Sequence, residues 1–256
     1  MSWERNIELK TPAEIEVMRE AGRINAMALN EVRKHVRPGV TTGQLDKIAE
    51  QLIRDHGGTP AFLNYPGPYP YPATLNTSVN EELVHGLPGK RELREGDVLS
   101  VDCGTIYKGF VGDSAFTMGI GEIAAEAQKL LDVTQESLRL GIQQMLPGKH
   151  VGDVSAAVQT YVEAHGYHVP REYTGHGVGR KMHEGPQVPN YGVPGQGVLL
   201  RTGMTIALEP MVLVGTHRTR VLPDQWTVVS ADGSLTAHFE HSVAVTDEGP
   251  LVLTAL

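Results

Sequence analysis

The chain repeats part of its own sequence at an offset of 109 residues. The segment RPGVTTGQLDKIAEQLIRDHGG, which begins at Arg37, matches LPGKHVGDVSAAVQTYVEAHGY, which begins at Leu146. Residues of the first copy that have identical counterparts in the second include Pro38, Gly43, His56 and Gly57. A repeat of this kind marks a recurring structural unit. We therefore predict an internal duplication, with halves of about 1–120 and 121–256 related by a pseudo-twofold axis.

Helix signals open each predicted half. Thr11-Pro12-Ala13-Glu14 is a capping box that predicts a helix to about residue 36, and Thr41 with Gln44 predicts a second that ends at the glycines 57–58. A third is expected over about 123–145, and the repeat supplies a fourth. Strand-rich sequence follows each helix pair, so each half should bury one face of its strands under its helices, and the halves should meet along one curved sheet.

Five residues with metal-binding side chains lie in apolar or glycine-rich surroundings: Asp102, Asp113, His176, Glu209 and Glu240. An unpaired charge in such surroundings is costly, so each of these groups needs a compensating partner. Carboxylate oxygens with one imidazole suit divalent cations such as Mn, Fe, Co or Zn, and two cations can neutralise four carboxylates. The set therefore predicts a hydrolase with two metal ions.

Asp102 and Asp113 lie in VLSVDCGTIYKGFVGDSAFTMGI, residues 98–120, where β-rich runs flank IYKG. This pattern predicts a β-hairpin. A loop centred between Tyr107 and Lys108 would place the two aspartates directly opposite each other on one face, where they repel unless a proton or a cation lies between them. The alternative is a pair of solvated aspartates on an exposed strand, but the apolar neighbours favour burial.

Glu209 is the single charged residue of GMTIALEPMVLVG. Pro210 cannot donate to a central ladder, so a strand should end or bulge there and direct Glu209 into a site. Glu240 lies in LTAHFEHSVAVT, where alternation places it on one face with His238 and Ser242. For Glu240 alone, a solvated polar face is an equal alternative.

His176 lies in YTGHGVGRKMHEGPQVPNY, where flanking glycines let the backbone approach a ligand closely. A lone histidine is more often structural. No βαβ unit surrounds these glycines, so a dinucleotide-binding loop is excluded. His183-Glu184 does not begin an H-E-x-x-H zinc motif, because the following Gly-Pro would break the helix.

Taken together, these segments resemble type I methionine aminopeptidases, which are metallopeptidases with the pita-bread fold. The resemblance runs from about residue 10 to the C-terminal end and is carried by SVNEELVHGLP, SVDCGTIYKGFVGDSA, TGHGVGRKMHEGPQVPNYG, TIALEPMV and WTVVSADGSLTAHFEHSVAVT. It implies an α/β (α+β) pita-bread fold, with helices of two pseudo-twofold-related halves over a curved, mainly antiparallel sheet, in a single catalytic domain of residues 1–256. Met182 stands where a phenylalanine is common, and residues 65–76 carry a few extra residues beside the substrate pocket.

The resemblance also implies an activity. The enzyme would remove the N-terminal methionine of nascent proteins and peptides when the second residue is small, with two divalent ions (Co, Mn, Fe or Zn) that share a hydroxide nucleophile. Asp113 and Glu240 would bind both ions, Asp102 one of them, and His176 with Glu209 the other. Glu209 would also carry a proton from the bound water to the leaving amine.

Further residues match the substrate side of such a site. By the resemblance, His85 and His183 would hydrogen-bond at the scissile amide, and His183 would help stabilise the tetrahedral intermediate. Four residues match the lining of the methionine pocket: Tyr65, Tyr71, Met182 and Trp226. Aromatic rings and a polarizable methionine suit a thioether side chain. Without the resemblance, all six would be read as structural or core residues.

Two other functions stay open. X-Pro aminopeptidases and prolidases share the fold, but they generally carry a large extra N-terminal domain and additional histidines near the site. Metal-free pita-bread binding proteins form a different class, and they have typically lost metal ligands. All five ligand positions are present in this chain, which favours a catalytic reading.

Composition bounds the partners and the compartment. The net charge of −8, without a cluster of Lys or Arg, argues against direct nucleic-acid binding, although a small basic patch could still contact the ribosome. The polar segment Met1–Lys10 and the lack of an 18-residue apolar span predict neither a signal peptide nor a membrane segment. The single cysteine, Cys103, rules out an internal disulfide and suits a reducing compartment. We expect a cytoplasmic, bacterial-type monomer.

Overall fold

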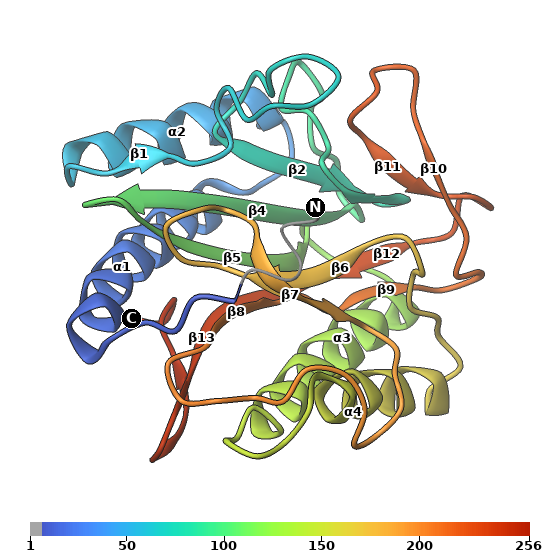
Figure 1. Ribbon diagram of the computed structural model, residues 1–256. Coiled ribbons are helices and arrows are strands. Elements are labelled where there is room, and N and C mark those ends of the chain that lie inside the picture. Colours follow the sequence, from blue (N-terminus) through green and yellow to red (C-terminus); the bar gives the residue numbers. More distant parts are fainter. Residues whose placement is uncertain (1–6) are drawn as a thin grey trace.

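Two helix pairs lie against one curved sheet (Figure 1). The computed structural model describes residues 7–256, so the first six residues of the polar segment Met1–Lys10 and of the predicted first half lie outside the described residues. The first pair is α1 (Pro12–His35) and α2 (Thr42–Asp55), and the second is α3 (Ala125–Gln143) and α4 (Val151–Ala164). Strands follow each pair, in the order that the sequence predicts.

Capping boxes begin the first two helices. Thr11 Oγ1 accepts the Glu14 N–H at 3.3 Å, and the Glu14 carboxylate accepts the Thr11 N–H at 2.8 Å. Thr41 and Gln44 repeat this exchange at 3.2 and 2.9 Å. Both boxes were predicted from the sequence and are confirmed. No helix within residues 7–256 is both long and apolar enough to cross a membrane.

Equivalent residues of the repeat adopt equivalent structures. Helices α2 and α4 both contain 14 residues. A histidine follows each helix, and its Nδ1 lies close to the carbonyl oxygen four residues earlier. The distance is 2.9 Å for His56 and 2.8 Å for His165. The glycines that follow, Gly57 and Gly166, have φ angles of 75° and 83°. The duplication and its division into halves stay predictions, which these parallels support.

The main sheet is antiparallel throughout and joins the two predicted halves at its centre. Within residues 7–256 its strand order is β1-β4-β5-β13-β8-β6-β7, with β2 beside β4 and β14 beside β13. These strands are β1 (Thr59–Pro60), β2 (Leu75–Val79), β4 (Val98–Tyr107), β5 (Phe110–Gly119), β6 (Thr174–Gly177), β7 (Glu184–Pro189), β8 (Thr205–Leu208), β13 (Glu240–Thr246) and β14 (Gly249–Val252). The central neighbours β5 and β13 come from different halves.

Two smaller groups of strands complete the fold. Strands β10 (Thr219–Val221), β11 (Val228–Ser230) and β3 (Glu82–Val84) pair in that order. Strand β12 (Thr236–His238) pairs with β9 (Met211–Leu213). The break between β12 and β13 and the break between β8 and β9 therefore lie beside each other.

The helices cover one face of the sheet and leave the opposite face to the candidate site. Asn25 of α1 donates a hydrogen bond to Ser114 Oγ on β5 at 2.8 Å, so the side chain of Ser114 faces the helices. Because side chains alternate along a strand, Asp113 faces the other side. A Cβ on Gly112 would lie 2.5 Å from the backbone nitrogen of Gly22, so only glycine lets α1 pack this closely on β5.

The β4–β5 hairpin corrects one prediction. Lys108 and Gly109, with φ angles of 47° and 79°, form a two-residue loop. The loop centre is one residue later than predicted, so Asp102 pairs with Ala115 and not with Asp113. The prediction that the aspartates are directly opposed is wrong; they are diagonal neighbours on one face. The physical reason is that a turn with two positive φ angles matches the twist of the strands.

Candidate metal centre

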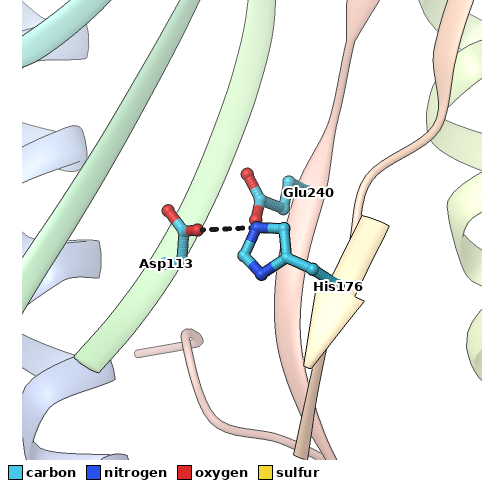
Figure 2. A group of neighbouring side chains, drawn as sticks. All are labelled: Asp113, His176 and Glu240. Carbon is cyan, nitrogen blue, oxygen red and sulfur yellow. Dashed lines mark ion pairs between the residues drawn. The ribbon is translucent and has the colours of Figure 1, made fainter. Parts of the chain in front are cut away.

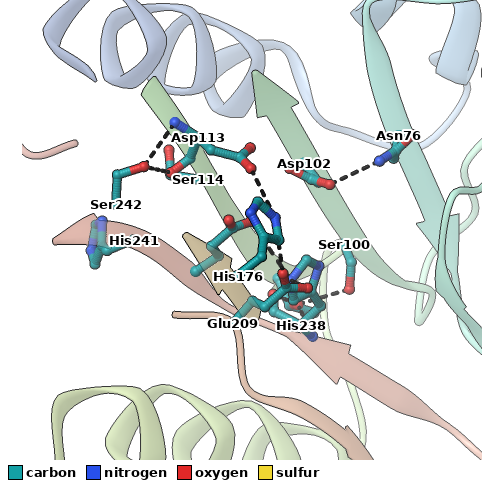
Figure 3. A network of polar contacts seen from close by, with 12 residues as sticks. Asn76, Ser100, Asp102, Asp113, Ser114, His176, Glu209, His238, His241 and Ser242 are labelled. Carbon is teal, nitrogen blue, oxygen red and sulfur yellow. Dashed lines mark hydrogen bonds and ion pairs between the residues drawn. The ribbon is translucent and has the colours of Figure 1, made fainter. Parts of the chain in front are cut away.

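The first half supplies two aspartates from adjacent strands (Figure 3). Asn76 on β2 pairs with Asp102 on β4 and donates Nδ2–H to its Oδ2 at 2.8 Å. Asp113 on β5 is only 2% exposed. Its N–H donates to Ser242 Oγ of β13 at 3.0 Å, and that hydroxyl donates to the Asp113 carbonyl oxygen at 2.9 Å. The hairpin is thereby tied to a strand of the second half at the point where the ligands meet.

The second half supplies three residues, each at an interruption of regular strand structure. The β6–β7 pairing shifts register directly after His176. Strand β8 ends before Glu209 and β9 begins after Pro210, which confirms the predicted strand end. Phe239 separates β12 from β13, whose first residue is Glu240. Interruptions release side chains from strict alternation and let them point into a common site.

These side chains converge. Asp113, His176 and Glu240 offer ligand atoms that all lie within 4.8 Å of one another (Figure 2). His176 Nε2 is 3.8 Å from Asp113 Oδ2 and 3.4 Å from Glu209 Oε1. Asp102 lines the same cavity. All five predicted positions are therefore together, and Glu240, at 2% exposed, is not on a solvated face.

Burial makes the four carboxyl groups hard to ionise together. Burial raises the pKa of Asp102 from its ordinary value to about 7. Burial, and then the charges of neighbouring carboxylates, raise the pKa of Asp113, Glu209 and Glu240 well above the usual range. Burial lowers the pKa of His176 to about 3, so its imidazole is neutral and has a lone pair to donate. Nearby cations would relieve the repulsion.

The donor set fits divalent cations. Within residues 7–256, three buried carboxylate oxygens of the cluster have no hydrogen-bond partner: Asp102 Oδ1, Asp113 Oδ1 and Glu240 Oε1. Buried acceptors left in this way cost free energy unless something binds them. Oxygen donors with one neutral imidazole are the ligands of Mn, Fe, Co and Zn. The cluster is therefore a buried candidate metal site.

The cluster forms one end of a cavity of about 280 Å³. The six residues predicted on the substrate side all line this cavity: His85, His183, Tyr65, Tyr71, Met182 and Trp226. A larger groove of about 650 Å³ lies between α1 and α3, on the other face of the sheet. Of the five ligand positions this groove touches only Glu240, so the smaller cavity is the better candidate for chemistry.

Ring contacts and hydrogen bonds position Tyr71 at the aromatic end of the cavity. The ring of Trp226 lies edge-on to Tyr71, with centroids 5.0 Å apart. Tyr71 is 2% exposed, and its hydroxyl donates to the carbonyl oxygens of Leu75 and Gly86 at 3.0 and 3.2 Å. The proline- and tyrosine-rich stretch 65–72 thus contributes Tyr65 and Tyr71 to the wall of the cavity.

The two non-ligand histidines, His85 and His183, line the same cavity as the five ligand positions and the aromatic rings. Tyr65 Oη is 2.5 Å from His183 Nδ1, and the His183 ring lies 4.2 Å from the ring of His176. Burial lowers the pKa of both His85 and His183 to about 4, so both rings are neutral near pH 7. A neutral imidazole held in this way can donate one hydrogen bond to a substrate.

Two residues of the site had no role in the sequence analysis. Asn76 donates a hydrogen bond to Asp102. The pairing of β2 with β4, which places Asn76 opposite Asp102, would have indicated this role. His238 was placed on the face of Glu240 but given no role. Its Nε2 is 3.7 Å from Glu209 Oε2 and 3.8 Å from Glu240 Oε2. Both relations depend on strand pairings that are distant in the sequence.

The chain is similar to known proteins over nearly its whole length. The model of "Metallopeptidase family M24" matches residues 16–247. The methionine aminopeptidase of Clostridium perfringens is 48% identical over 250 residues, which cover 98% of this chain and 99% of that protein. Methionine aminopeptidase 1 of Bacillus subtilis is 49% identical and covers 96% of this chain and 98% of its own length.

Solved structures agree with the sequence comparison. The crystal structure of methionine aminopeptidase from Thermotoga maritima has a TM-score of 0.95 at 47% identity and covers 98% of this chain and 100% of that one. The prolidase of Pyrococcus furiosus has a TM-score of 0.78 at 21% identity, covering 97% of this chain and 65% of that one. The second likeness shows the shared fold alone.

Proposed function

Since the chain belongs to metallopeptidase family M24, as a methionine aminopeptidase with the pita-bread fold, we propose that it removes the N-terminal methionine of nascent proteins and that its carboxylate cluster would hold two divalent cations for this reaction. Metal-dependent removal of an N-terminal methionine is the activity of the methionine aminopeptidases in this family. The number of ions and the range of substrates are the proposed parts. One observation carries the proposal: four carboxyl groups, of which Asp113 and Glu240 are buried, meet a neutral imidazole in a cavity that is also lined by aromatic rings.

The resemblance to methionine aminopeptidases implies the ligand roles. Asp113 and Glu240 would contact both ions, and their place in one group with His176 supports this assignment. His176 and Glu209, 3.4 Å apart, would hold one ion, and Asp102, oriented by Asn76, the other. When bound, the ions supply Lewis acidity toward a water molecule and the scissile carbonyl. Cobalt, manganese, iron and zinc all suit this donor set.

Glu209 is our candidate for proton transfer. It lies outside the strand ladders, so its side chain is less constrained than that of Asp102 or Asp113. Burial and the neighbouring aspartates raise its pKa well above the usual range, which suits a group that must both accept and release a proton. It would take a proton from the attacking water and deliver it to the leaving amine.

His183 and His85 would act on the scissile amide. The Tyr65 hydroxyl can donate to His183 Nδ1, and the ring proton would then lie on Nε2. An Nε2–H donor placed beside the cluster can stabilise negative charge that develops on the carbonyl oxygen. His85 lies on the other side of the same cavity, against Trp226 at 6.3 Å between ring centroids.

The aromatic end would hold the methionine side chain. Tyr65, Tyr71 and Trp226 present ring faces and edges, and Met182 adds a polarizable sulfur. Sulfur contacts with aromatic rings are favourable and loosely directional, so such a pocket suits a flexible thioether. The cavity of about 280 Å³ lies at the lower end of the range for small-molecule sites.

The same confinement supports selectivity for a small second residue. Met-Gly, Met-Ala and Met-Ser peptides should be cleaved well, whereas a large second side chain would displace the scissile carbonyl. A displacement of about 1 Å can cost on the order of 10² in rate. Steady-state kinetics on a Met-X-Ser series should show this difference largely in kcat. Equal efficiency for Met-Ala-Ser and Met-Leu-Ser would contradict the narrow site.

A single assay separates the proposed function from its rivals. Methionine release from Met-Ala-Ser should be strong with added metal and abolished by a chelator, while Ala-Pro peptides should not be cleaved. Preferential cleavage of X-Pro peptides would indicate a prolidase-type enzyme. Binding without cleavage, with or without metal, would indicate a binding protein of the same fold.

The partners and the compartment complete the proposal. The substrates are protein N-termini, and emerging polypeptides at the ribosome are the proposed source. The acidic net charge of −8 supports the expectation that nucleic acid is not bound directly. A monomer in the cytoplasm remains our prediction.

A further inference from the structure

Glu209 is flanked by two imidazoles, one beside each carboxylate oxygen (Figure 3). His176 Nε2 lies 3.4 Å from Oε1, and His238 Nε2 lies 3.7 Å from Oε2. The proposed function uses His176 as a metal ligand and gives His238 no role. In the proposed assignment His176 marks the metal side of Glu209, so Oε1 would face a bound ion, whereas Oε2 lies on the side of His238.

The position of His238 is fixed by its backbone. Thr117 Oγ1 accepts the His238 N–H at 2.9 Å and donates to the His238 carbonyl oxygen at 2.7 Å. His238 also pairs with Met211, the first residue of β9 after the interruption that contains Glu209 and Pro210. The imidazole therefore projects from a tightly held backbone segment that lies beside the segment carrying Glu209.

Few hydrogen-bond acceptors lie near the imidazole of His238. His238 is 2% exposed, and within residues 7–256 its Nε2 has no hydrogen-bond partner. A buried polar nitrogen left in this state destabilises the fold unless an acceptor moves to it. The nearby ion-pair acceptors are Glu209 Oε2 at 3.7 Å and Glu240 Oε2 at 3.8 Å. Neither distance is a hydrogen bond, but a carboxylate rotation that moves Oε2 by about 0.8 Å would form one.

Glu209 is the better acceptor of the two. In the proposed metal assignment, Glu240 contacts both ions and so uses both of its oxygens. Glu209 contacts one ion, which leaves Oε2 available. A hydrogen bond to this second oxygen would orient the carboxylate plane, as partners of metal-binding carboxylates commonly do.

We propose that His238 is a positioning residue for Glu209. Its Nε2–H donates to Glu209 Oε2 and holds the carboxylate while Oε1 faces the ion, so that Glu209 is aligned for proton transfer. The inference rests on the proposed function, because the role of Glu209 does. It predicts that His238 affects turnover without supplying a metal ligand.

Three variants test the proposal. His238→Gln keeps an amide N–H at a similar reach, His238→Asn keeps the amide but shortens it, and His238→Leu removes the donor. The control is His217→Leu, at an exposed histidine outside the site. For each protein we would measure bound metal per chain, the visible absorption spectrum of the cobalt-loaded form, thermal unfolding, and kcat and KM on Met-Ala-Ser.

The expected pattern is specific. His238→Leu and His238→Asn should bind as much metal as the wild type and keep KM within a small factor, but lose about 10–10² in kcat and change the cobalt spectrum. His238→Gln should recover most of the lost kcat. If His238→Leu does not fold, the difference between the Gln and Asn variants carries the test.

Three results would overturn the inference. Wild-type kcat in His238→Leu would show that no positioning bond exists, and equal kcat in the Gln and Asn variants would show that the reach of the donor is irrelevant. Loss of metal from the Leu and Gln variants alike would make His238 a ligand. Failure of the proposed function looks different, because the wild type itself would then release no methionine from Met-Ala-Ser.

Discussion

The two predicted halves supply their ligand positions in different ways. Asp102 and Asp113 lie inside continuous ten-residue strands, whereas His176, Glu209 and Glu240 lie at interruptions. In a continuous ladder, the pairing register fixes where a side chain points. At an interruption, ladder hydrogen bonds are given up and the side chain can be redirected. Asp102 and Asp113 therefore have side-chain directions that the strand ladder fixes. The three ligand positions of the other half depend on irregular backbone to direct their side chains toward this pair.

The largest expected effect comes from the continuous β4–β5 hairpin, which carries Asp102 and Asp113. Asp113→Ala should bind metal poorly and lower kcat/KM by at least roughly 10³-fold, because it removes a carboxylate that both ions are proposed to share. Bound metal and methionine release would be measured on the same preparation. Asp132→Ala, at an exposed position of α3, is the control and should resemble the wild type. Wild-type activity of Asp113→Ala under limiting metal would mean that the continuous hairpin is not part of the metal site.

In the second half, where the strands are interrupted, His183→Ala should remove a group that stabilises the transition state. We expect kcat to fall by about 10²–10³, the range for a lost oxyanion donor, with metal content unchanged. His217→Ala at an exposed site serves as control. Loss of metal from His183→Ala would make it a ligand and would add a fourth residue to the interrupted side.

The fixed aspartates should also make the metal-free protein sensitive to pH. Because the pKa of Asp102 is raised from 3.8 to about 7 in the folded state, its contribution to stability is full below pH 3.8 and is lost as the pH rises through 7. Asp102→Asn removes the ionisable group, so the variant does not lose this stability as the pH rises. In chelator, the unfolding free energy of the variant relative to wild type should therefore rise by about 2–4 kcal/mol between pH 4 and pH 8. A constant difference across this range would show that Asp102 ionises freely without metal.

The smallest effect concerns the repeated helices. Thr41→Ala should lower the unfolding free energy by about 1 kcal/mol, because Thr41 Oγ1 accepts the Gln44 N–H at 3.2 Å. In the second copy, Asp153→Ala should cost about as much, since Asp153 accepts the His150 N–H at 2.7 Å. Chemical denaturation of the two variants and of the double variant should give additive losses. A negligible cost in one copy would break the equivalence of the two helices.

Much of the fold and site could be predicted because the signals are local. The boxes at Thr11 and Thr41 lie within four residues of chain, and Pro210 alone marks the strand end at Glu209. Residues with metal-binding side chains in apolar sequence were expected to be buried, and Asp113 and Glu240 are buried in the structure.

The parts that were missed depend on register. Nothing in IYKG indicates that Lys108 adopts a φ of 47°, since this conformation is uncommon for lysine, and the loop centre was therefore misplaced. The partners of Asn76 and His238 are set by pairings β2–β4 and β12–β9, between segments about 25 residues apart. Such relations cannot be read from one segment.

A metal titration coupled to activity tests the central claim most directly. Metal-free protein would be titrated with cobalt or manganese by calorimetry, and methionine release from Met-Ala-Ser would be assayed at each point. The account predicts binding of two ions per chain, no activity before metal is added, and full activity at saturation. Saturation at one ion per chain, or turnover that persists in protein stripped of metal, would contradict it.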